Sequence, residues 1–246
     1  MRPPSENHKK MSNRPVGAIV ELPVSTHPAP TTLKGRTINL VPLRVTHADE
    51  LFPLVNNADP FQTALWDYIP DGPYDDVAHL RADFASREIS KDPVFFAIID
   101  TRPSRPTTGN AIGYIAFMNI SSGHRRIEIG HVIFTKALQR TIGATEAVYL
   151  LLQHAIEELG YRRVEWKCNA LNEGSRRAAV RLGFQFEGIF RQHMVVKGRN
   201  RDTAWFSIVR EEWPELKKAF DGWLDEGNFD ENGAQRRRLE EFRASA

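Results

Sequence analysis

The pattern of apolar and polar residues predicts a series of strands followed by alternating helices and strands. Short apolar segments fall at 94–99, 112–120 and 126–134, and turn-rich polar residues separate them. Strands spaced this closely favour an antiparallel meander. From there the order becomes strand, helix, strand, helix, with an amphipathic helix over 144–159 and a strand over 164–168. That order favours a parallel strand pair joined by a right-handed crossover.

The pattern predicts further elements on both sides of this series. The segment 37–43 alternates as a half-buried strand, and its Pro42 indicates the edge of a sheet. A proline-punctuated loop over 58–75 carries Trp66 and Tyr68. The other expected elements are a helix that starts at 46, a helix over 76–88, a hairpin of 185–196 and 201–210, and a helix over 211–220.

Composition divides the chain into three sections. The first 33 residues hold six of the fifteen prolines, and we expect 1–33 to be a flexible, proline-rich basic tail. Residues 34–220 are expected to form the folded domain, and 221–246 a charged C-terminal tail. Residues 1–36 carry six Lys or Arg and two acids, a net charge of +4, so the remainder carries −2 of the total of +2. A slightly acidic body argues against nucleic-acid binding.

The remaining composition indicates an ordinary globular protein. No apolar run approaches the roughly 20 residues of a membrane helix, so no membrane partner is expected. There is no secretory signal pattern, and the single cysteine, Cys168, excludes an internal disulfide and a cysteine-based zinc site. We therefore expect a cytoplasmic protein.

A candidate anion site lies where the strand 127–134 leads into the helix at 144. The turn Gln139-Arg140-Thr141-Ile142-Gly143-Ala144-Thr145 opens directly into that helix. The first turn of a helix carries unpaired N–H groups and a partial positive charge, to which phosphate binds. Gly143 allows a close backbone approach, and Arg140, Thr141 and Thr145 add donors. Taken alone, the pattern also fits an ordinary strand-to-helix turn.

The second helix supports the phosphate interpretation. Asn172 is a good N-cap, Ser175 lies at position N3, and Gly183-Phe184 is a typical helix end. Each of these could serve capping alone, and for Asn172 capping is the favoured interpretation. The order and spacing of both helices are more informative than either helix by itself.

Together these motifs resemble the GNAT superfamily of acetyl-CoA-dependent N-acetyltransferases, in its RimJ/RimL-like branch. The turn from Arg140 to Thr145 is similar to the family's pyrophosphate loop, except that Thr145 replaces a small residue. Asn172 and Ser175, followed by Leu182-Gly183-Phe184, resemble its cofactor-side helix. Further similarity lies at Leu40-Val41-Pro42-Leu43, Glu187-Gly188, Arg191, Gly198, Asp202 and Glu212-Trp213.

The resemblance implies the fold and the ligands. The fold class would be α/β (α+β), the GNAT fold. Its central mixed, mostly antiparallel sheet would have about seven strands, with helices on both faces, and would splay at the two central parallel strands. Acetyl-CoA would be the acyl donor, without a metal. Trp66 and Tyr68 occupy the position of the acceptor pocket, although packing is the favoured interpretation for both. The implied cofactor-binding residues are Val132, Ile133, Phe134, Arg140, Thr141, Ile142, Gly143, Ala144, Thr145 and Asn172.

Two residues are candidates for proton transfer. Strand alternation places Glu128 on one face with Gly130, Val132 and Phe134. A carboxylate there could take the proton of an attacking amine, although an ion pair with Arg126 fits Glu128 equally well. Many family members place a tyrosine where Ala179 stands. By resemblance, Ser175 takes over the role of proton donor to the thiolate.

Three functions remain open at this level. The first is a transferase (acyltransferase) that moves acetyl directly to a primary amine of a small molecule. The second is a protein N-terminal acetyltransferase of the RimJ/RimL type. The third is a non-catalytic acyl-CoA-binding module, against which the presence of both Glu128 and Ser175 argues. The acceptor would be a small amine or a peptide N-terminus, and a homodimer remains open.

Overall fold

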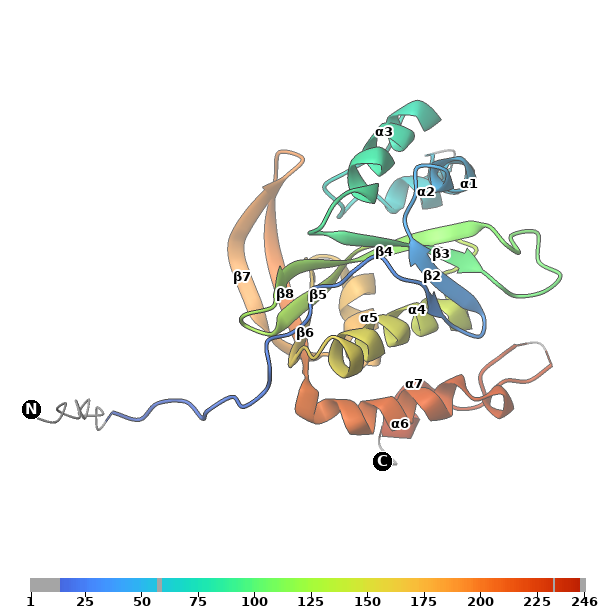
Figure 1. Ribbon diagram of the computed structural model, residues 1–246. Coiled ribbons are helices and arrows are strands. Elements are labelled where there is room, and N and C mark those ends of the chain that lie inside the picture. Colours follow the sequence, from blue (N-terminus) through green and yellow to red (C-terminus); the bar gives the residue numbers. More distant parts are fainter. Residues whose placement is uncertain (1–13, 57–58, 232, 244–246) are drawn as a thin grey trace, which may run out of the picture.

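The fold is built on one central sheet with helices on both faces (Figure 1). The computed structural model describes residues 14–56, 59–231 and 233–243. In these residues the sheet has eight strands in the order β1-β2-β3-β4-β5-β6-β8-β7. All neighbouring strands pair antiparallel except β5 and β6, which are parallel. The expected mixed, mostly antiparallel sheet is confirmed, with one two-residue strand more than predicted.

The elements follow the expected order closely. The strands are β1 (Leu33–Lys34), β2 (Ile38–Pro42), β3 (Val94–Asp100), β4 (Ala111–Ser121), β5 (Arg126–Phe134), β6 (Arg163–Asn169), β7 (Gln185–Val196) and β8 (Arg199–Val209). The helices are α1 (His47–Val55), α2 (Pro60–Ala64), α3 (Val77–Glu88), α4 (Ile142–Gln153), α5 (Glu173–Arg181), α6 (Trp213–Leu224) and α7 (Leu239–Arg243). A π-helical turn, His154–Glu158, extends α4, and α2 lies in the segment that was expected to be a loop.

Two hydrophobic cores lie on opposite faces of the sheet. The larger core packs α4, α5 and α6 against one face, with Ile127, Leu151 and Trp166 among its buried residues. The smaller core packs α1 and α3 against the other face, around Phe84 and Trp66. Figure 1 shows α1–α3 on one side of the sheet and α4–α7 on the other. The sheet is therefore covered on both faces over β2–β5.

The two parallel strands separate toward their C-terminal ends. Pairing of β5 with β6 runs only from Arg126 opposite Arg163 to Ile129 opposite Trp166. Beyond these pairs, β5 remains bonded to β4 but its other edge leaves β6. The predicted splay is thus confirmed, and it leaves the backbone edge of 130–134 open.

A β-bulge at His131 changes which side chains share a face. The pairing with β4 shifts between Gly130 and Ile133, and His131 has a positive φ of 47°. Ile129 lies in the larger core, whereas Ile133 lies in the smaller one. The predicted common face of Glu128, Gly130, Val132 and Phe134 is therefore wrong beyond Gly130, because a bulge reverses the alternation.

Parts of both expected tails pack on the domain. Ser25 is buried, its hydroxyl donates to Gly160 O, and Thr26 N donates to Leu159 O at 2.9 Å. At the other end, Leu239 of α7 is buried against α6. The first 13 residues lie outside the described part of the chain, and the division into one domain and two tails stays a prediction.

Candidate active site

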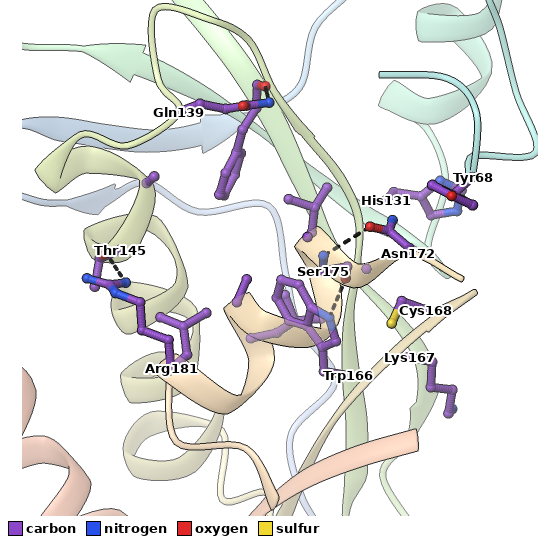
Figure 2. A pocket seen from close by; sticks show the side chains of 18 of the residues that line it. Tyr68, His131, Gln139, Thr145, Trp166, Lys167, Cys168, Asn172, Ser175 and Arg181 are labelled. Carbon is purple, nitrogen blue, oxygen red and sulfur yellow. Dashed lines mark hydrogen bonds between the residues drawn. The ribbon is translucent and has the colours of Figure 1, made fainter. Parts of the chain in front are cut away.

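The splayed end of the sheet opens into a cleft of about 1560 Å³. Its walls come from β5, β6, α4, α5, the loop after α2, the β7–β8 hairpin and the segment around Phe229. Figure 2 shows Thr145 and Arg181 on one side of this cleft, Ser175 and Trp166 in the middle, and Tyr68 and Lys167 on the other side. The cleft thus joins the predicted phosphate turn to the predicted acceptor loop.

The N-terminus of α4 is open toward the cleft. Thr141 has the extended backbone of an N-cap residue, yet within the described chain no side chain caps this helix. The Thr141 hydroxyl instead donates to Leu138 O at 2.7 Å. Because Thr141, Ile142 and Ala144 all line the cleft, the first-turn N–H groups are available to an anion.

Two arginines place positive charge near this helix end. Arg140 lines the cleft, is exposed and has a positive φ of 60°. Arg181 of α5 donates to Thr145 Oγ1 at 2.9 Å and stacks on Trp223 at 5.0 Å from the ring centroid. Burial lowers the pKa of Arg181 without removing its charge. Thr145, the residue that departs from the family's loop pattern, therefore holds a cation beside the helix end.

Gly143 has a packing reason in addition to the backbone role predicted for it. It is buried and does not line the cleft. A Cβ on Gly143 would lie 2.7 Å from Ile38 Cγ2 and 3.3 Å from Leu138 Cδ1. The prediction that Gly143 allows a close backbone approach to a phosphate stays a prediction, because this contact concerns the side-chain position only. Its missing side chain lets α4 pack closely on β2.

The start of α5 is capped by its own sequence. Asn172 Oδ1 accepts from Ser175 N at 3.0 Å, as the N-cap interpretation predicted. Ser175 Oγ accepts from Trp166 Nε1 at 2.9 Å (Figure 2), so the hydroxyl can still donate its own proton, and the Cys168 thiol is one neighbouring acceptor. At the other end of α5, Phe184 N bonds to Ala179 O and Gly183 N bonds to Val180 O. These bonds form the Schellman motif, in which Gly183 has a positive φ of 96°.

Cys168 lines the cleft beside Ser175 but is not an activated thiol. Burial raises the pKa of its thiol, and a hydrogen bond from Ser175 opposes this shift only in part. Cys168 and Trp166 both belong to the larger core, as their shared strand face predicted. Because the thiolate is the nucleophilic form, this cysteine is poorly suited to carry an acyl group.

Glu128 lies in the cleft and is tied to Lys167 rather than to Arg126. Its Oε2 atom accepts from Lys167 Nζ at 2.6 Å and from Asn119 Nδ2 at 2.7 Å. Lys167 Nζ also lies 2.7 Å from Glu165 Oε2. Burial alone would raise the pKa of Glu165, but hydrogen bonds from Lys167 and Arg163 lower it below its usual value. Across the described residues, Oε1 of Glu128 has no hydrogen-bond partner, so one carboxylate oxygen is anchored and the other is free.

The two aromatic residues predicted at the acceptor pocket lie in different environments. Tyr68 lines the cleft, and its hydroxyl donates to Leu171 O at 3.3 Å. Trp66 is wrong as a substrate-binding residue, because its side chain is 1% exposed in the smaller core and its Nε1 donates to Val55 O. Packing decides its position: Gly72 lies directly against the indole, where a Cβ would come within 2.4 Å.

Of the three β5 residues predicted to bind the cofactor, Val132 and Phe134 line the cleft. The side chain of Ile133 is buried in the smaller core instead. The predicted contact involves the backbone, however, and the edge of 130–134 is unpaired on the β6 side among the described strands. An extended ligand could add to this edge as a further strand.

The cleft residues that the sequence analysis missed include Lys167, Arg181 and Arg201. Lys167 lies between the core residues Trp166 and Cys168, so strand alternation predicts that its side chain lies on the other face of β6. Arg181 lies six residues after Ser175, about 120° away around the helix, so helical spacing gave no clear signal for it. For Arg201, on a hairpin strand distant in sequence, we find no such signal.

Residues 14–56, 59–231 and 233–243 show neither a membrane-spanning helix nor a cluster of metal ligands. In these ranges no helix is long and apolar enough to cross a membrane. Nor does any group of three His, Cys, Asp or Glu side chains in these ranges come together in a way that could hold a metal ion.

Comparisons with known proteins agree with the geometry. The model of the acetyltransferase (GNAT) domain family matches residues 37–185. The uncharacterized N-acetyltransferase YoaA of Bacillus subtilis is 34% identical over 43% of this chain and 59% of its own length. YdaF of the same organism, provisionally named a ribosomal N-acetyltransferase, is 33% identical over 43% of this chain and 57% of its own length. The chain thus spans less than two thirds of the length of these two relatives.

A solved structure matches over most of the chain. The crystal structure of a GCN5-related N-acetyltransferase from Brucella melitensis is 42% identical and superposes with a TM-score of 0.84. The match covers 89% of this chain and 97% of that one.

Proposed function

Because this chain belongs to the GNAT acetyltransferase family, an acyltransferase family, we propose that it transfers acetyl from acetyl-CoA directly to a primary amine of a small molecule. The observation that carries the proposal is the cleft itself. One end presents an uncapped helix N-terminus, and the middle presents Glu128 and Ser175. An anionic cofactor and a proton-transfer pair can therefore act in one continuous space.

The residues present fit the diphosphate of coenzyme A. Unpaired N–H groups at the start of α4 suit phosphate oxygens, and Arg140 and Arg181 add charge-assisted donors. The open edge of β5 at Val132 and Phe134 suits the amide groups of the pantetheine arm. We propose that Thr141, Ile142, Ala144 and Thr145 contribute to the same site, whereas Gly143 contributes its backbone alone.

Glu128 is proposed as the proton acceptor. When bound, acetyl-CoA supplies a thioester carbonyl carbon that an amine can attack. Free amines have pKa values of about 8 to 10.4 and are mostly protonated near neutral pH. The free Oε1 atom of Glu128 can take such a proton, while Lys167 and Asn119 hold Oε2 in place. Lys167 is thus a positioning residue.

Ser175 is proposed as the proton donor to the departing sulfur. Its hydroxyl accepts from Trp166 Nε1, and its own proton is available on the cleft side. Neighbouring Cys168 has its thiol pKa raised by burial, so it does not compete as a nucleophile. This arrangement favours direct transfer over an acyl-enzyme.

A protein N-terminus is the second candidate acceptor. The RimJ/RimL-like motifs and the provisional ribosomal name of YdaF favour it. A non-catalytic acyl-CoA-binding module is the third possibility, and the open oxygen of Glu128 argues against it.

A free-thiol release assay tests the proposal. Acetyl-CoA is offered with a panel of small amines, polyamines and peptides, and thiol appearance is followed. Glu128→Gln is expected to lower turnover by about 100-fold while acetyl-CoA affinity by calorimetry stays unchanged, because general-base catalysis contributes roughly 10²–10⁴-fold.

Glu165→Gln is the matched control. It also loses a carboxylate partner of Lys167, but Glu165 does not line the cleft, so near-normal turnover is expected. Equal turnover in Glu128→Gln and the unaltered protein would remove Glu128 from the mechanism. Coenzyme A binding without thiol release for any amine would favour the binding module.

A further inference from the structure

The acceptor side of the cleft carries a cation that the protein does not neutralise. Lys167 on β6 lies opposite Trp205 on β8, with Nζ 4.0 Å from the ring centroid. Arg201 is four residues from Trp205 along β8, so both side chains project from the same face of the sheet. Both also line the cleft, as Glu128 does. The cleft therefore presents one carboxylate and two cations side by side.

These two cations differ in their partners. Lys167 is held between Glu128 and Glu165, so its charge is balanced. Arg201 makes no ion pair or side-chain hydrogen bond with any described residue, and its buried Nε atom has no partner. Burial lowers the pKa of Arg201, as expected for a cation that lacks a full counter-charge.

An unbalanced, half-buried guanidinium is costly to the fold unless something pairs with it. Other cleft arginines are satisfied differently: Arg102 bonds to the buried Asp100, and Arg181 bonds to Thr145. A guanidinium matches a carboxylate in two parallel hydrogen bonds, which gives both affinity and orientation. Arg201 is therefore suited to a carboxylate that arrives with a ligand.

We propose that the acceptor carries a carboxylate in addition to its amine, and that Arg201 binds this carboxylate while the amine faces Glu128. The inference rests on the proposed acetyl transfer and names its substrate class. Arg201 and Glu128 both line the cleft, so one acceptor can present a carboxylate to the first and an amine to the second. A polyamine would instead place a second positive charge near Arg201.

Two hydrogen bonds hold the acceptor side of the cleft together. Lys197, at the turn of the β7–β8 hairpin, donates to Trp66 O at 2.9 Å, and Tyr68 donates to Leu171 O. These contacts tie the acceptor loop to the hairpin and to the segment before α5. The carboxylate could belong to a free amino acid or to an acidic side chain near a peptide N-terminus.

The test compares acceptors that differ only in their carboxylate. Thiol release from acetyl-CoA is measured with the free L-amino acids against their amides, with Glu-Ala-amide against Gln-Ala-amide, and with spermidine. We expect a carboxylate-bearing member to react at least tenfold more efficiently than its neutral counterpart. A preference for free amino acids over their amides would assign the carboxylate to an amino acid. A preference for Glu-Ala-amide over Gln-Ala-amide would assign it to an acidic side chain of a peptide.

Variants assign the preference to Arg201. Arg201→Gln is expected to raise KM for the carboxylate-bearing acceptor at least tenfold, with little change for the neutral counterpart or in coenzyme A affinity by calorimetry. Arg201→Lys should recover part of the preference. Arg199→Gln, an exposed arginine outside the cleft on the same strand, is the matched control and should behave as the unaltered protein.

Three outcomes would overturn the inference. Preferential acetylation of amides or spermidine would show that the acceptor lacks a carboxylate. An equal effect of Arg201→Gln on both members of a pair would assign it a structural role. Failure to release thiol with every amine, despite coenzyme A binding, would refute the proposed function, and this inference with it.

Discussion

Helices α4 and α5 begin beside the same cleft but differ in how their N-termini are satisfied. Asn172 caps α5 by accepting from Ser175 N, whereas the hydroxyl of Thr141 turns away from α4 and donates to Leu138 O. Both residue types are good N-caps in isolation. The N–H groups at the start of α4 are thus left for a ligand in the proposed function, whereas those of α5 are partly satisfied by its own sequence.

The largest effect is expected from a negative charge added at the uncapped N-terminus of α4. Ala144→Glu places a carboxylate in the first turn of α4, where it stabilises the helix dipole but repels phosphate. We expect acetyl-CoA affinity to fall by about 100-fold or more, since like charges about 4 Å apart near a protein surface cost roughly 4 kcal/mol. Isothermal titration calorimetry measures the affinity, and thermal unfolding verifies the fold.

Ala78→Glu is the matched control for that change. Ala78 is exposed in the first turn of α3, a helix already capped by Asp76 and distant from the cleft. Its acetyl-CoA affinity should equal that of the unaltered protein. Normal binding by Ala144→Glu would show that α4 does not hold the diphosphate.

A smaller effect is expected from Arg140. Arg140→Asn removes the guanidinium but keeps a residue type that tolerates the positive φ of this position. Acetyl-CoA affinity should fall about tenfold, because charge-assisted hydrogen bonds contribute roughly 1.5–3 kcal/mol, and this difference should shrink at high salt. Titrations at two salt concentrations measure both effects. Lys136→Asn, exposed on the same connection outside the cleft, should change neither.

Substitutions at the capped N-terminus of α5 should change the stability of the fold rather than its affinity for acetyl-CoA. Asn172→Ala is expected to lower the free energy of unfolding by about 1 kcal/mol, because a cap is lost. Asn172→Asp should restore it, and urea denaturation measures both. If acetyl-CoA affinity drops in Asn172→Ala and also in Asn172→Asp, the side chain contacts the cofactor as the family resemblance implies.

The smallest effect concerns a third kind of helix start, capped by a carboxylate. Asp76 accepts from His79 N at the start of α3, and this bond lowers its pKa below the usual 3.8. A lowered pKa means that the stabilisation is present above pH 3.8 and is lost as pH falls through the lower folded-state value. Asp76→Asn should therefore show a smaller loss of Tm on acidification than the unaltered protein. Asp75 is a neighbour that does not cap the helix. Asp75→Asn should therefore show the same loss of Tm on acidification as the unaltered protein.

Local sequence signals predicted most of the fold. The N-cap at Asn172, the helix end at Gly183 and the alternation within β6 depend on contacts among residues a few positions apart. The prediction of β5 was limited because it, too, used only residues a few positions apart. A bulge at His131 depends on how β4 pairs with β5, so simple alternation failed beyond Gly130.

The candidate site was predicted only in part, for a related reason. The phosphate turn and the Ser175 position were recognised because each lies within one short segment. Trp66 was named as a possible acceptor contact although packing was favoured, and contacts with Gly72 and Val55 bury it in the smaller core. Lys167 and Arg201 were missed because their partners, or the lack of partners, depend on strands far apart in sequence.

The order of strands and helices, the helix caps and the resemblance to acetyltransferases follow from the order of residues alone, because hydrophobic periodicity and capping act over a few residues. Only the assembled sheet determines the partner of Glu128, the packing of Gly143 and the unbalanced charge of Arg201. Packing and electrostatics act between neighbours in space, and the chain brings those neighbours together from positions that no local pattern connects.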